Sequence, residues 1–351
     1  MTNELPSVRT VPLVVTGFGN VGRALMSLLR EKEDDLRRRY GLAFDVLAVG
    51  RAEGCFHAGA PLEVRHLSKD GKPWTTGNPS WHEGMRATDV IEATGPGGCL
   101  VECTLSDLRT GEPGLTYISA AFRGGWHAVA ASKGALVVGF RALRALAAEN
   151  GVFLKFSGAT AAALPTLDVG LFSLAGSRIE GIQGILNGTT NYILTRMAEG
   201  LDYAEALLEA QSKGIAEPDP AYDVGGWDTA SKILLITNAC LDADYVLADV
   251  QVRGISGLDA DFVQSAKKEG RSVKLLATAA PRRHGGRWSL DVRPSLVEAT
   301  HPLVHVNGTE KGITFLTDSM GSVTVTGGRS NPRGAAAALL KDIINIYRPA
   351  F

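Results

Sequence analysis

Apolar runs alternate with helical patterns through the first part of the chain. Val11 to Thr16 (VPLVVT) is apolar and β-branched, as expected for a strand buried on both faces of a parallel sheet. A glycine turn and an amphipathic helical stretch follow it. Strand, glycine turn and helix in this order are typical of a dinucleotide-binding fold, where the helix start meets a pyrophosphate. The expected cofactor contacts in the turn are Gly17, Phe18, Gly19, Asn20, Val21 and Gly22.

The same rhythm continues to about residue 150. Strands are predicted at 44–49 (FDVLAV), 89–94 (DVIEAT) and 127–131 (HAVAA), with helices near 100–109, over 118–123 and from 134 to 150. Because ligands lie beyond the carboxyl ends of parallel strands, Thr94 and Lys133 are expected to face the cofactor, and Lys133 also the substrate carbonyl.

Arg51 stands at the end of the second predicted strand. An acidic residue usually binds the ribose 2′-hydroxyl there, whereas a guanidinium suits a 2′-phosphate. We therefore predict NADP(H) in preference to NAD(H), while Glu53 leaves NAD(H) as an alternative.

The pattern changes after Gly151. A short strand over 152–156 and a strand over 178–186 are followed by helices over 192–199, 202–212 and 227–243, and by alternating segments typical of antiparallel strands. The fold class is thus α/β: an N-terminal Rossmann dinucleotide-binding domain plus an α+β substrate and dimerisation domain. The predicted domains are 1–150, completed by a returning strand and helix over 325–351, and 151–324; the alternating segments are 272–279, 288–292 and 312–317.

Composition narrows the function. The chain has 351 residues, 45% hydrophobic and 21% charged, with a net charge of −1, so it offers no field that would attract nucleic acid or an anionic membrane. It has no apolar run of about eighteen residues or more, no signal-peptide layout and only four scattered cysteines, so we expect a cytoplasmic protein.

The most chemically dense stretch is 214–232 (GIAEPDPAYDVGGWDTASK). Its prolines forbid a helix at the start of the stretch, and Gly225-Gly226 let the backbone turn before a helix that is expected to begin near Trp227. Asp228 and Lys232 then lie on one helix face. By spacing alone, this pair is equally well read as a surface ion pair after an acidic loop. The NGTTN turn at 187–191, which includes Thr189, either caps a helix or lines a pocket.

Together these motifs resemble the homoserine dehydrogenase family. The resemblance covers nearly the whole chain through GFGNVG, Ser132-Lys133, NGTTNYIL and the 214–232 stretch. It implies reversible NAD(P)-dependent conversion of aspartate 4-semialdehyde to homoserine, on the route to threonine and methionine. Glu217 and Asp228 match the carboxylates that hold the amino acid, Lys232 the proton donor, and Lys133 a second active-site lysine. We also expect Asp223 and Thr189 on the substrate side.

The chemistry is consistent with these residues. Hydride delivery to an aldehyde leaves an alkoxide that a lysine ammonium can protonate, and an acidic neighbour keeps that lysine charged. The other readings are a dehydrogenase of a related amino-acid aldehyde and a non-catalytic NADP-binding protein. We expect a small-molecule substrate and a homodimer, and neither nucleic acid nor a membrane as partner.

The chain departs from the family pattern in places. Ser132 replaces the usual Asn, and the turn GGRSNPRG is less Gly/Ala-rich than its counterpart. The family's monovalent-cation site, commonly for Na⁺, uses a Glu where this chain has Ser157, which leaves only the carbonyls of Thr160, Ala162 and Leu164 as weak candidate ligands. No threonine-sensing C-terminal domain follows, so we do not expect feedback inhibition through one.

Overall fold

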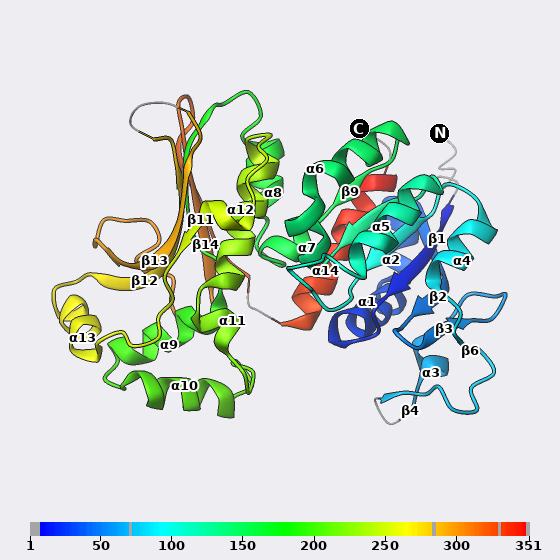
Figure 1. Ribbon diagram of the computed structural model, residues 1–351, viewed down its shortest axis with the longest axis horizontal. Coiled ribbons are helices and arrows are strands. Elements are labelled where there is room, and N and C mark those ends of the chain that lie inside the picture. The colour runs from blue at the N-terminus through cyan, green and yellow to red at the C-terminus, as the bar shows by residue number, and fades with distance from the viewer. Residues whose placement is uncertain (1–7, 70–71, 283–285, 329–330, 349–351) are drawn as a thin grey trace. The chain divides into compact units, whose positions relative to one another are not determined.

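The computed structural model describes residues 8–69, 72–282, 286–328 and 331–348, which form two compact units (Figure 1). The first unit combines the chain up to residue 159 with the chain from 331, and the second unit is 160–330. The sequence analysis placed these divisions after 150 and after 324.

The first unit is built on a seven-stranded sheet in the order β6-β3-β2-β1-β7-β8-β9. Strands β2, β1, β7, β8 and β9 are parallel to one another. On the β2 side, β3 pairs antiparallel with β2, and β6 pairs antiparallel with β3. Residues 52–86, which carried no assignment from sequence, thus include two strands of this sheet. The bounds are β1 Arg9–Thr16, β2 Leu42–Gly50, β3 Gly54–His57, β6 Trp81–Glu83, β7 Cys99–Glu102, β8 His127–Ala130 and β9 Leu154–Lys155, with the small hairpin β4 Ser68–Lys69 and β5 Lys72–Pro73.

The predicted strand over 89–94 is wrong, and so is the predicted helix near 100–109. Residues 87–94 form helix α4 (Ala87–Thr94), and the third parallel strand is β7. Asp89 accepts a hydrogen bond from the backbone N–H of Arg86 at 3.0 Å, which closes a capping box at the start of α4. Ala87, Val90 and Ile91 are buried at helical spacing, so the apolar run fits a short helix as well as a strand.

The C-terminal helix α14 (Pro332–Tyr347) packs on α1 (Asn20–Glu31) in the first unit. Leu339 and Ile343 of α14 are 0% exposed and belong to one core with the apolar residues of β1 and α1. Arg333 also forms an ion pair with Glu31 at 2.6 Å. The other helices of this unit are α2 Glu33–Tyr40, α3 Val64–Leu67, α4, α5 Gly114–Arg123 and α6 Gly134–Glu149, and α7 Ser157–Thr160 contains the division between the units.

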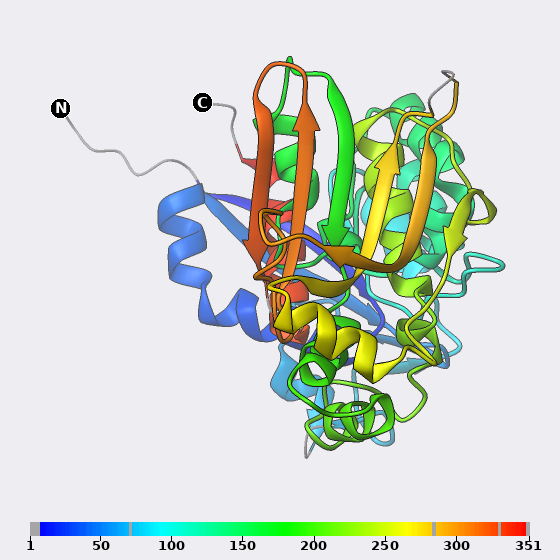
Figure 2. The same ribbon diagram turned by 90° about the vertical axis from the view of Figure 1, so that its left-hand side faces the viewer.

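The second unit is built on a six-stranded sheet in the order β11-β13-β12-β10-β14-β15, seen side by side in Figure 2. Only the β11–β13 pair is parallel, which confirms the predicted antiparallel α+β arrangement. The bounds are β10 Ile179–Ile185, β11 Val250–Val252, β12 Ser272–Ala280, β13 Ser289–Val297, β14 Lys311–Thr317 and β15 Gly321–Gly327. The helices are α8 Thr166–Asp168, the π-helical η1 Val169–Ser173, α9 Gly188–Ala198, α10 Tyr203–Ser212, α11 Ala221–Val224, α12 Trp227–Cys240, the 3₁₀ turn η2 Leu247–Asp249 and α13 Ala260–Lys268.

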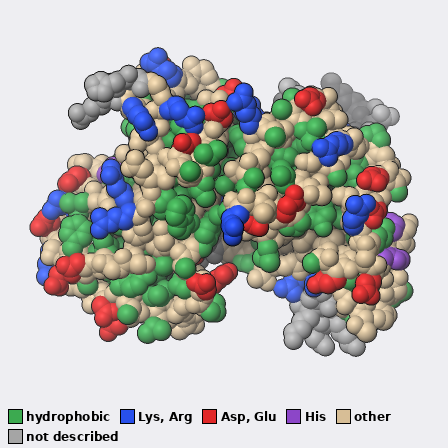
Figure 3. Space-filling view, viewed as in Figure 1, with side chains coloured by type: hydrophobic (Ala, Val, Ile, Leu, Met, Phe, Trp, Pro, Cys, Tyr) green, Lys and Arg blue, Asp and Glu red, His purple; other side chains and the backbone are tan. Residues whose placement is uncertain are grey.

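No helix among the described residues is long and apolar enough to cross a bilayer. On the face of the molecule drawn in Figure 3, basic and acidic side chains are interspersed, in line with the net charge of −1.

Candidate active site

The turn between β1 and α1 has the geometry of a phosphate cradle. Gly17 has φ +89°, and a Cβ there would lie 2.3 Å from the carbonyl oxygen of Cys103. A Cβ on Gly22 would lie 2.3 Å from the carbonyl oxygen of Gly17, so only glycine allows this close approach of helix to turn. Gly19 caps α1 without a side-chain hydrogen bond, and the first helical turn carries no acidic residue. Its N–H groups and positive dipole end therefore suit a pyrophosphate.

Arg51 and Glu53 lie directly after the carboxyl end of β2. The Arg51 Nε atom is 3.4 Å from Glu53 Oε2, yet it makes no hydrogen bond with any described residue. The Arg51 side chain is 29% exposed and that of Glu53 63%. An arginine and an acidic residue thus stand together where the ribose of a dinucleotide would bind.

Thr94 does not follow a strand, as the sequence analysis expected. It ends α4, donates its hydroxyl hydrogen to the carbonyl of Val90 at 2.7 Å, and leads into the amino end of β7. Cys103 and Thr104 are the residues that follow the carboxyl end of β7. The reason for expecting a cofactor contact at Thr94 is therefore removed.

Sequence reasoning missed the fully buried Glu102, the last residue of β7. Its carboxylate accepts hydrogen bonds from the Thr104 N–H at 2.8 Å and from the hydroxyls of Thr104 and Ser132. Burial raises the pKa of Glu102, and these hydrogen bonds act in the opposite direction. An acidic residue ending an apolar segment was the available signal.

Lys133 lies just after β8, at the carboxyl edge of the first sheet, as predicted. Its backbone N–H donates to the Ser106 hydroxyl at 2.8 Å, and its neighbour Ser132 donates to Glu102. The departure from the family's Asn at position 132 therefore still leaves this segment tied to the neighbouring strand.

In the second unit, Asp228 and Lys232 form a buried ion pair on α12. Lys232 Nζ lies 2.6 Å from Asp228 Oδ2, and the two side chains are 14% and 9% exposed. Lys232 also donates to the carbonyl of Leu186 at 2.9 Å. The surface-pair reading of this spacing is wrong, because the pair lies on the buried face of the helix.

Gly226 makes this placement possible. It starts α12 with φ +86°, a left-handed conformation that favours glycine, and a Cβ there would lie 3.1 Å from a methyl group of Val252. The helix then buries Ile233 and Ile236, and Asp228 in its first turn is buried as well.

Asn187, which the sequence analysis did not single out within its turn, joins the two acidic residues. Its Nδ2 donates to Asp223 Oδ1 and to Asp228 Oδ2, both at 2.8 Å, while its Oδ1 caps α9 by accepting from the N–H of Thr190. The NGTTN turn therefore both caps a helix and borders the acidic cluster. Burial, followed by the charge of Asp228, raises the pKa of Asp223, and Lys232 acts in the opposite direction.

Thr189 and Glu217 occupy different surroundings. Thr189 is buried and donates to the carbonyl of Ile215 at 3.0 Å. A hydrogen bond from Thr189 also opposes the rise in the pKa of Asp223. The Glu217 side chain is exposed, and its carboxylate makes no hydrogen bond or ion pair with the described residues. The structure thus gathers Asp223, Asp228, Lys232 and Thr189, and leaves Glu217 outside these contacts.

Comparison with known proteins identifies the family. The profile described as "Homoserine dehydrogenase" matches residues 165–344. The homoserine dehydrogenase of Methanocaldococcus jannaschii is 35% identical over 95% of this chain and 98% of its own. The chain belongs to the homoserine dehydrogenase family.

Two further members of the family are similar over almost their full lengths. The NAD(+)-dependent homoserine dehydrogenase of Pseudomonas canavaninivorans is 33% identical, with 96% of each chain covered. The crystal structure of a putative homoserine dehydrogenase from Archaeoglobus fulgidus superposes with a TM-score of 0.84 at 32% identity, covering 97% of this chain and all of that one. The resemblance and the two-part fold expected from sequence are confirmed.

The monovalent-cation site implied by the homoserine dehydrogenase resemblance does not fit the residues present. The Ser157 N–H and hydroxyl donate to Asp342 at 2.8 and 2.9 Å, and Lys341 donates to the same hydroxyl. The Leu164 carbonyl accepts from the N–H of Thr166 at 2.8 Å. At the centre of the turn, the ammonium of Lys311 donates to the carbonyl of Ala161 at 2.8 Å. The described residues also hold no cluster of three or more His, Cys, Asp or Glu suited to a metal.

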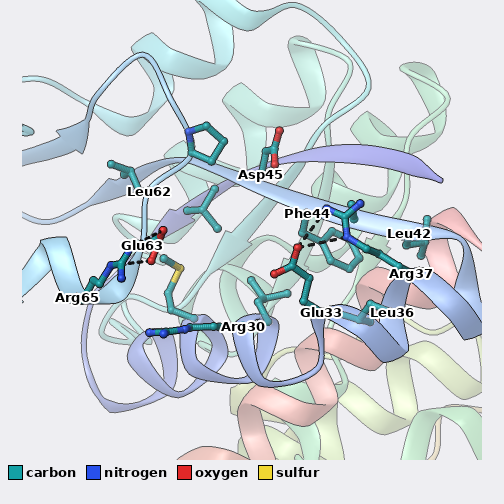
Figure 4. Close-up of a pocket in the computed structure, with 15 residues that line it drawn as sticks. Arg30, Glu33, Leu36, Arg37, Leu42, Phe44, Asp45, Leu62, Glu63 and Arg65 are labelled. Carbon is teal, nitrogen blue, oxygen red and sulfur yellow. Dashed lines mark hydrogen bonds and ion pairs between the residues drawn. The ribbon is translucent and has the colours of Figure 1, made fainter.

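A separate pocket of about 430 Å³ lies in the first unit between α1, α2, β2 and residues 61–65 (Figure 4). Its charged lining is largely paired within itself, Arg37 with Glu33 at 3.1 Å and Arg65 with Glu63 at 2.9 Å. None of its lining residues belongs to the glycine turn or to the Asp228–Lys232 pair.

Proposed function

We propose that this protein interconverts L-aspartate 4-semialdehyde and L-homoserine with NAD(P)(H), on the route to threonine and methionine. The supporting observation is the setting of Lys232. Two hydrogens of its ammonium are held by Asp228 and Leu186, which leaves the third for a substrate oxygen. A buried, oriented ammonium of this kind is suited to protonate an alkoxide.

The nicotinamide supplies or accepts the hydride when bound. In the reducing direction the aldehyde carbon gains that hydride, and Lys232 donates its proton to the carbonyl oxygen. Asp228 keeps Lys232 charged and oriented, and Asn187 holds Asp228 in place through its Nδ2. Asp223 and Glu217 are acidic groups for the substrate ammonium, and Lys133 is a second cation for the substrate carbonyl or carboxylate.

Substitution of Lys232 by Met tests this assignment. The variant should lose kcat by about two to four orders of magnitude, as general acid–base groups do, while its Kd for NADPH stays unchanged. Lys267→Met, on the exposed face of α13, is the matched control and should keep full activity. Homoserine oxidation followed at the nicotinamide absorbance band measures both; a loss below tenfold would remove Lys232 from the chemistry.

We also propose that the 2′-position of the ribose is read by Arg51 and Glu53 together, with NADP(H) preferred. The relative from Pseudomonas canavaninivorans is named NAD(+)-dependent, so membership of the family does not by itself favour NADP(H). Arg51 supports NADP(H) because its Nε lacks a hydrogen bond within the described residues. A 2′-phosphate would add the negative charge that this guanidinium can bind.

Two variants at this position separate the cofactors. Arg51→Ala should weaken NADPH binding at least tenfold with little effect on NADH, because only NADPH carries the 2′-phosphate. Glu53→Gln should have the opposite effect on the ratio, since it removes a negative charge beside that phosphate. Fluorescence titration with each cofactor measures the two Kd values. Equal losses for NADPH and NADH in Arg51→Ala would contradict the proposal.

We propose in addition that the protein is a homodimer formed through the second unit. Strand β15 ends the six-stranded sheet, and its sequence, GSVTVTG, contains no charged residue. Edge strands without charge or proline are open to pairing with another chain.

A further inference from the structure

Lys311 is an unusual residue within the second unit. It opens β14, is only 2% exposed, and donates from Nζ to the carbonyl of Ala161 at 2.8 Å. No carboxylate of the described residues forms an ion pair with it. A buried ammonium without a carboxylate partner is costly, so its presence needs a reason in the local chemistry.

The carbonyl it meets belongs to a tight turn. The Ala161 carbonyl also accepts from the N–H of Leu164 at 3.2 Å, and Ala162 between them has φ +53°, in the left-handed region that non-glycine residues rarely adopt. Ala161 lies between Thr160 and Ala162, whose carbonyls are the candidate cation ligands, so the Lys311 ammonium bonds a carbonyl within the same segment. Carbonyl oxygens are ligands for hard cations. An ammonium carries the same single charge as Na⁺ or K⁺ and binds the same oxygens.

We propose that the Lys311 ammonium substitutes for a monovalent cation at the turn over 160–164, because it brings a positive charge onto a carbonyl of that turn and would repel a second cation there. The cation that this segment implies by resemblance is replaced by a side chain covalently attached to the chain. Ser157 is consistent with this replacement, because the loss of a carboxylate ligand accompanies the gain of an internal positive charge. The protein therefore works without added Na⁺ or K⁺.

The charge on Lys311 also reaches the candidate catalytic pair. Burial, followed by the positive charge of Lys232, lowers the pKa of Lys311 to about 7, and the charge of Asp228 acts in the opposite direction. Lys311 therefore lies within electrostatic range of both members of the pair. Protonated or neutral, its nitrogen fills the space and can donate to the Ala161 carbonyl.

The test compares salts at equal ionic strength and pH. The melting temperature of the wild-type protein should be the same in NaCl, KCl and tetramethylammonium chloride, and homoserine oxidation should be equally fast in all three. Lys311→Asn removes the ammonium and leaves an amide oxygen as a ligand. NaCl or KCl should raise the melting temperature of this variant by a few degrees over tetramethylammonium, as a ligand of the folded state does.

Lys274→Asn is the matched control. Lys274 is equally buried, also 2% exposed, and it too donates to a backbone carbonyl, that of Val306. Its variant should be destabilised to the same extent in every salt.

A wild-type melting temperature selectively raised by Na⁺ or K⁺, or a Lys311→Asn variant indifferent to them, would overturn the proposal. Should Lys311→Asn fail to fold, ²³Na relaxation on the wild type decides: saturable Na⁺ binding overturns it and its absence supports it. None of these melting or relaxation readouts depends on the proposed reaction.

Discussion

Side-chain amides and hydroxyls donate hydrogen bonds to the buried carboxylates of this protein. The side-chain nitrogen of Asn187 donates hydrogen bonds to two carboxylates, those of Asp223 and Asp228. In the other unit, the hydroxyls of Ser132 and Thr104 both donate to the single carboxylate of Glu102. A carboxylate that receives such donors is stabilised in its charged form, which opposes the effect of burial. Neutral neighbours therefore oppose the rise in pKa that burial causes for Glu102, and for Asp223 they act in the same direction as the charge of Lys232.

The pH dependence of stability should identify Lys311. Its pKa of about 7 in the folded protein lies below the ordinary value of 10.5, so between these pH values the unfolded chain binds more protons. The free energy of unfolding of the wild type should thus rise with pH over this window relative to Lys311→Met, by at most about 1.4 kcal/mol per pH unit. Below pH 7 both states are protonated and the difference should be constant.

Urea denaturation at a series of pH values from 6 to 10 measures this difference. Lys274→Met is the control, because burial lowers the pKa of Lys274 to about 8 and its rise should begin correspondingly later. Parallel pH profiles for the wild type and Lys311→Met would show that Lys311 titrates normally in the folded protein.

At the scale of elements, the sequence predicted those whose pattern and turn chemistry agree. β1, the glycine turn and α1 were recognisable because an apolar strand, glycines and an amphipathic helix follow one another in the order of a dinucleotide-binding fold. α12 was recognisable because Gly226 precedes it and the apolar Ile233 and Ile236 lie within it. The 87–102 region was misread because an eight-residue segment, 87–94, with three buried apolar positions fits a strand and a short helix equally well. Only the sheet itself, which needs β7 beside β1, resolves that ambiguity.

The candidate site was predictable in its charges but not in its connections. Asp228 and Lys232 are visible at i and i+4, whereas their burial depends on the packing of α12 against the sheet. Asn187 joins Asp223 and Asp228 across more than thirty residues of chain, a contact that no local spacing encodes. Likewise, nothing in the sequence near Lys311 indicates that its side chain reaches Ala161.

Helix α14 should contribute heavily to the stability of the first unit. Leu339 is 0% exposed in the core shared with α1 and β1, so Leu339→Ala leaves a cavity and should lower the free energy of unfolding by about 2–5 kcal/mol. Ala337→Ser, on the exposed side of the same helix, should change it by less than about 0.5 kcal/mol. Urea denaturation measures both. Equal, small effects would mean that α14 is not part of the cooperative core.

At the scale of the whole molecule, the proposed cofactor-binding and proton-transfer residues belong to different units of the chain. The glycine turn and Lys133 lie in the first unit, and Asp228, Lys232 and Lys311 in the second. The chain then returns to the first unit to add α14. Each unit has its own sheet and its own buried residues.

The proposed homodimer can be tested at β15, the outer strand of the second sheet. Ser322 and Thr326 of β15 are exposed and two residues to either side of Thr324, so all three face the same way. In a two-fold interface each side chain meets its own copy or a near neighbour, and a lysine there meets a like charge. The double substitution Ser322→Lys and Thr326→Lys should therefore convert the dimer to a monomer, as measured by light scattering coupled to size-exclusion chromatography.

Gln251→Lys, on the opposite edge strand β11, is the control and should remain dimeric, because the charge lies at the other end of the sheet. A dimer that survives the β15 substitutions but dissociates with Gln251→Lys would place the interface at β11, and a monomeric wild type would refute the dimer altogether.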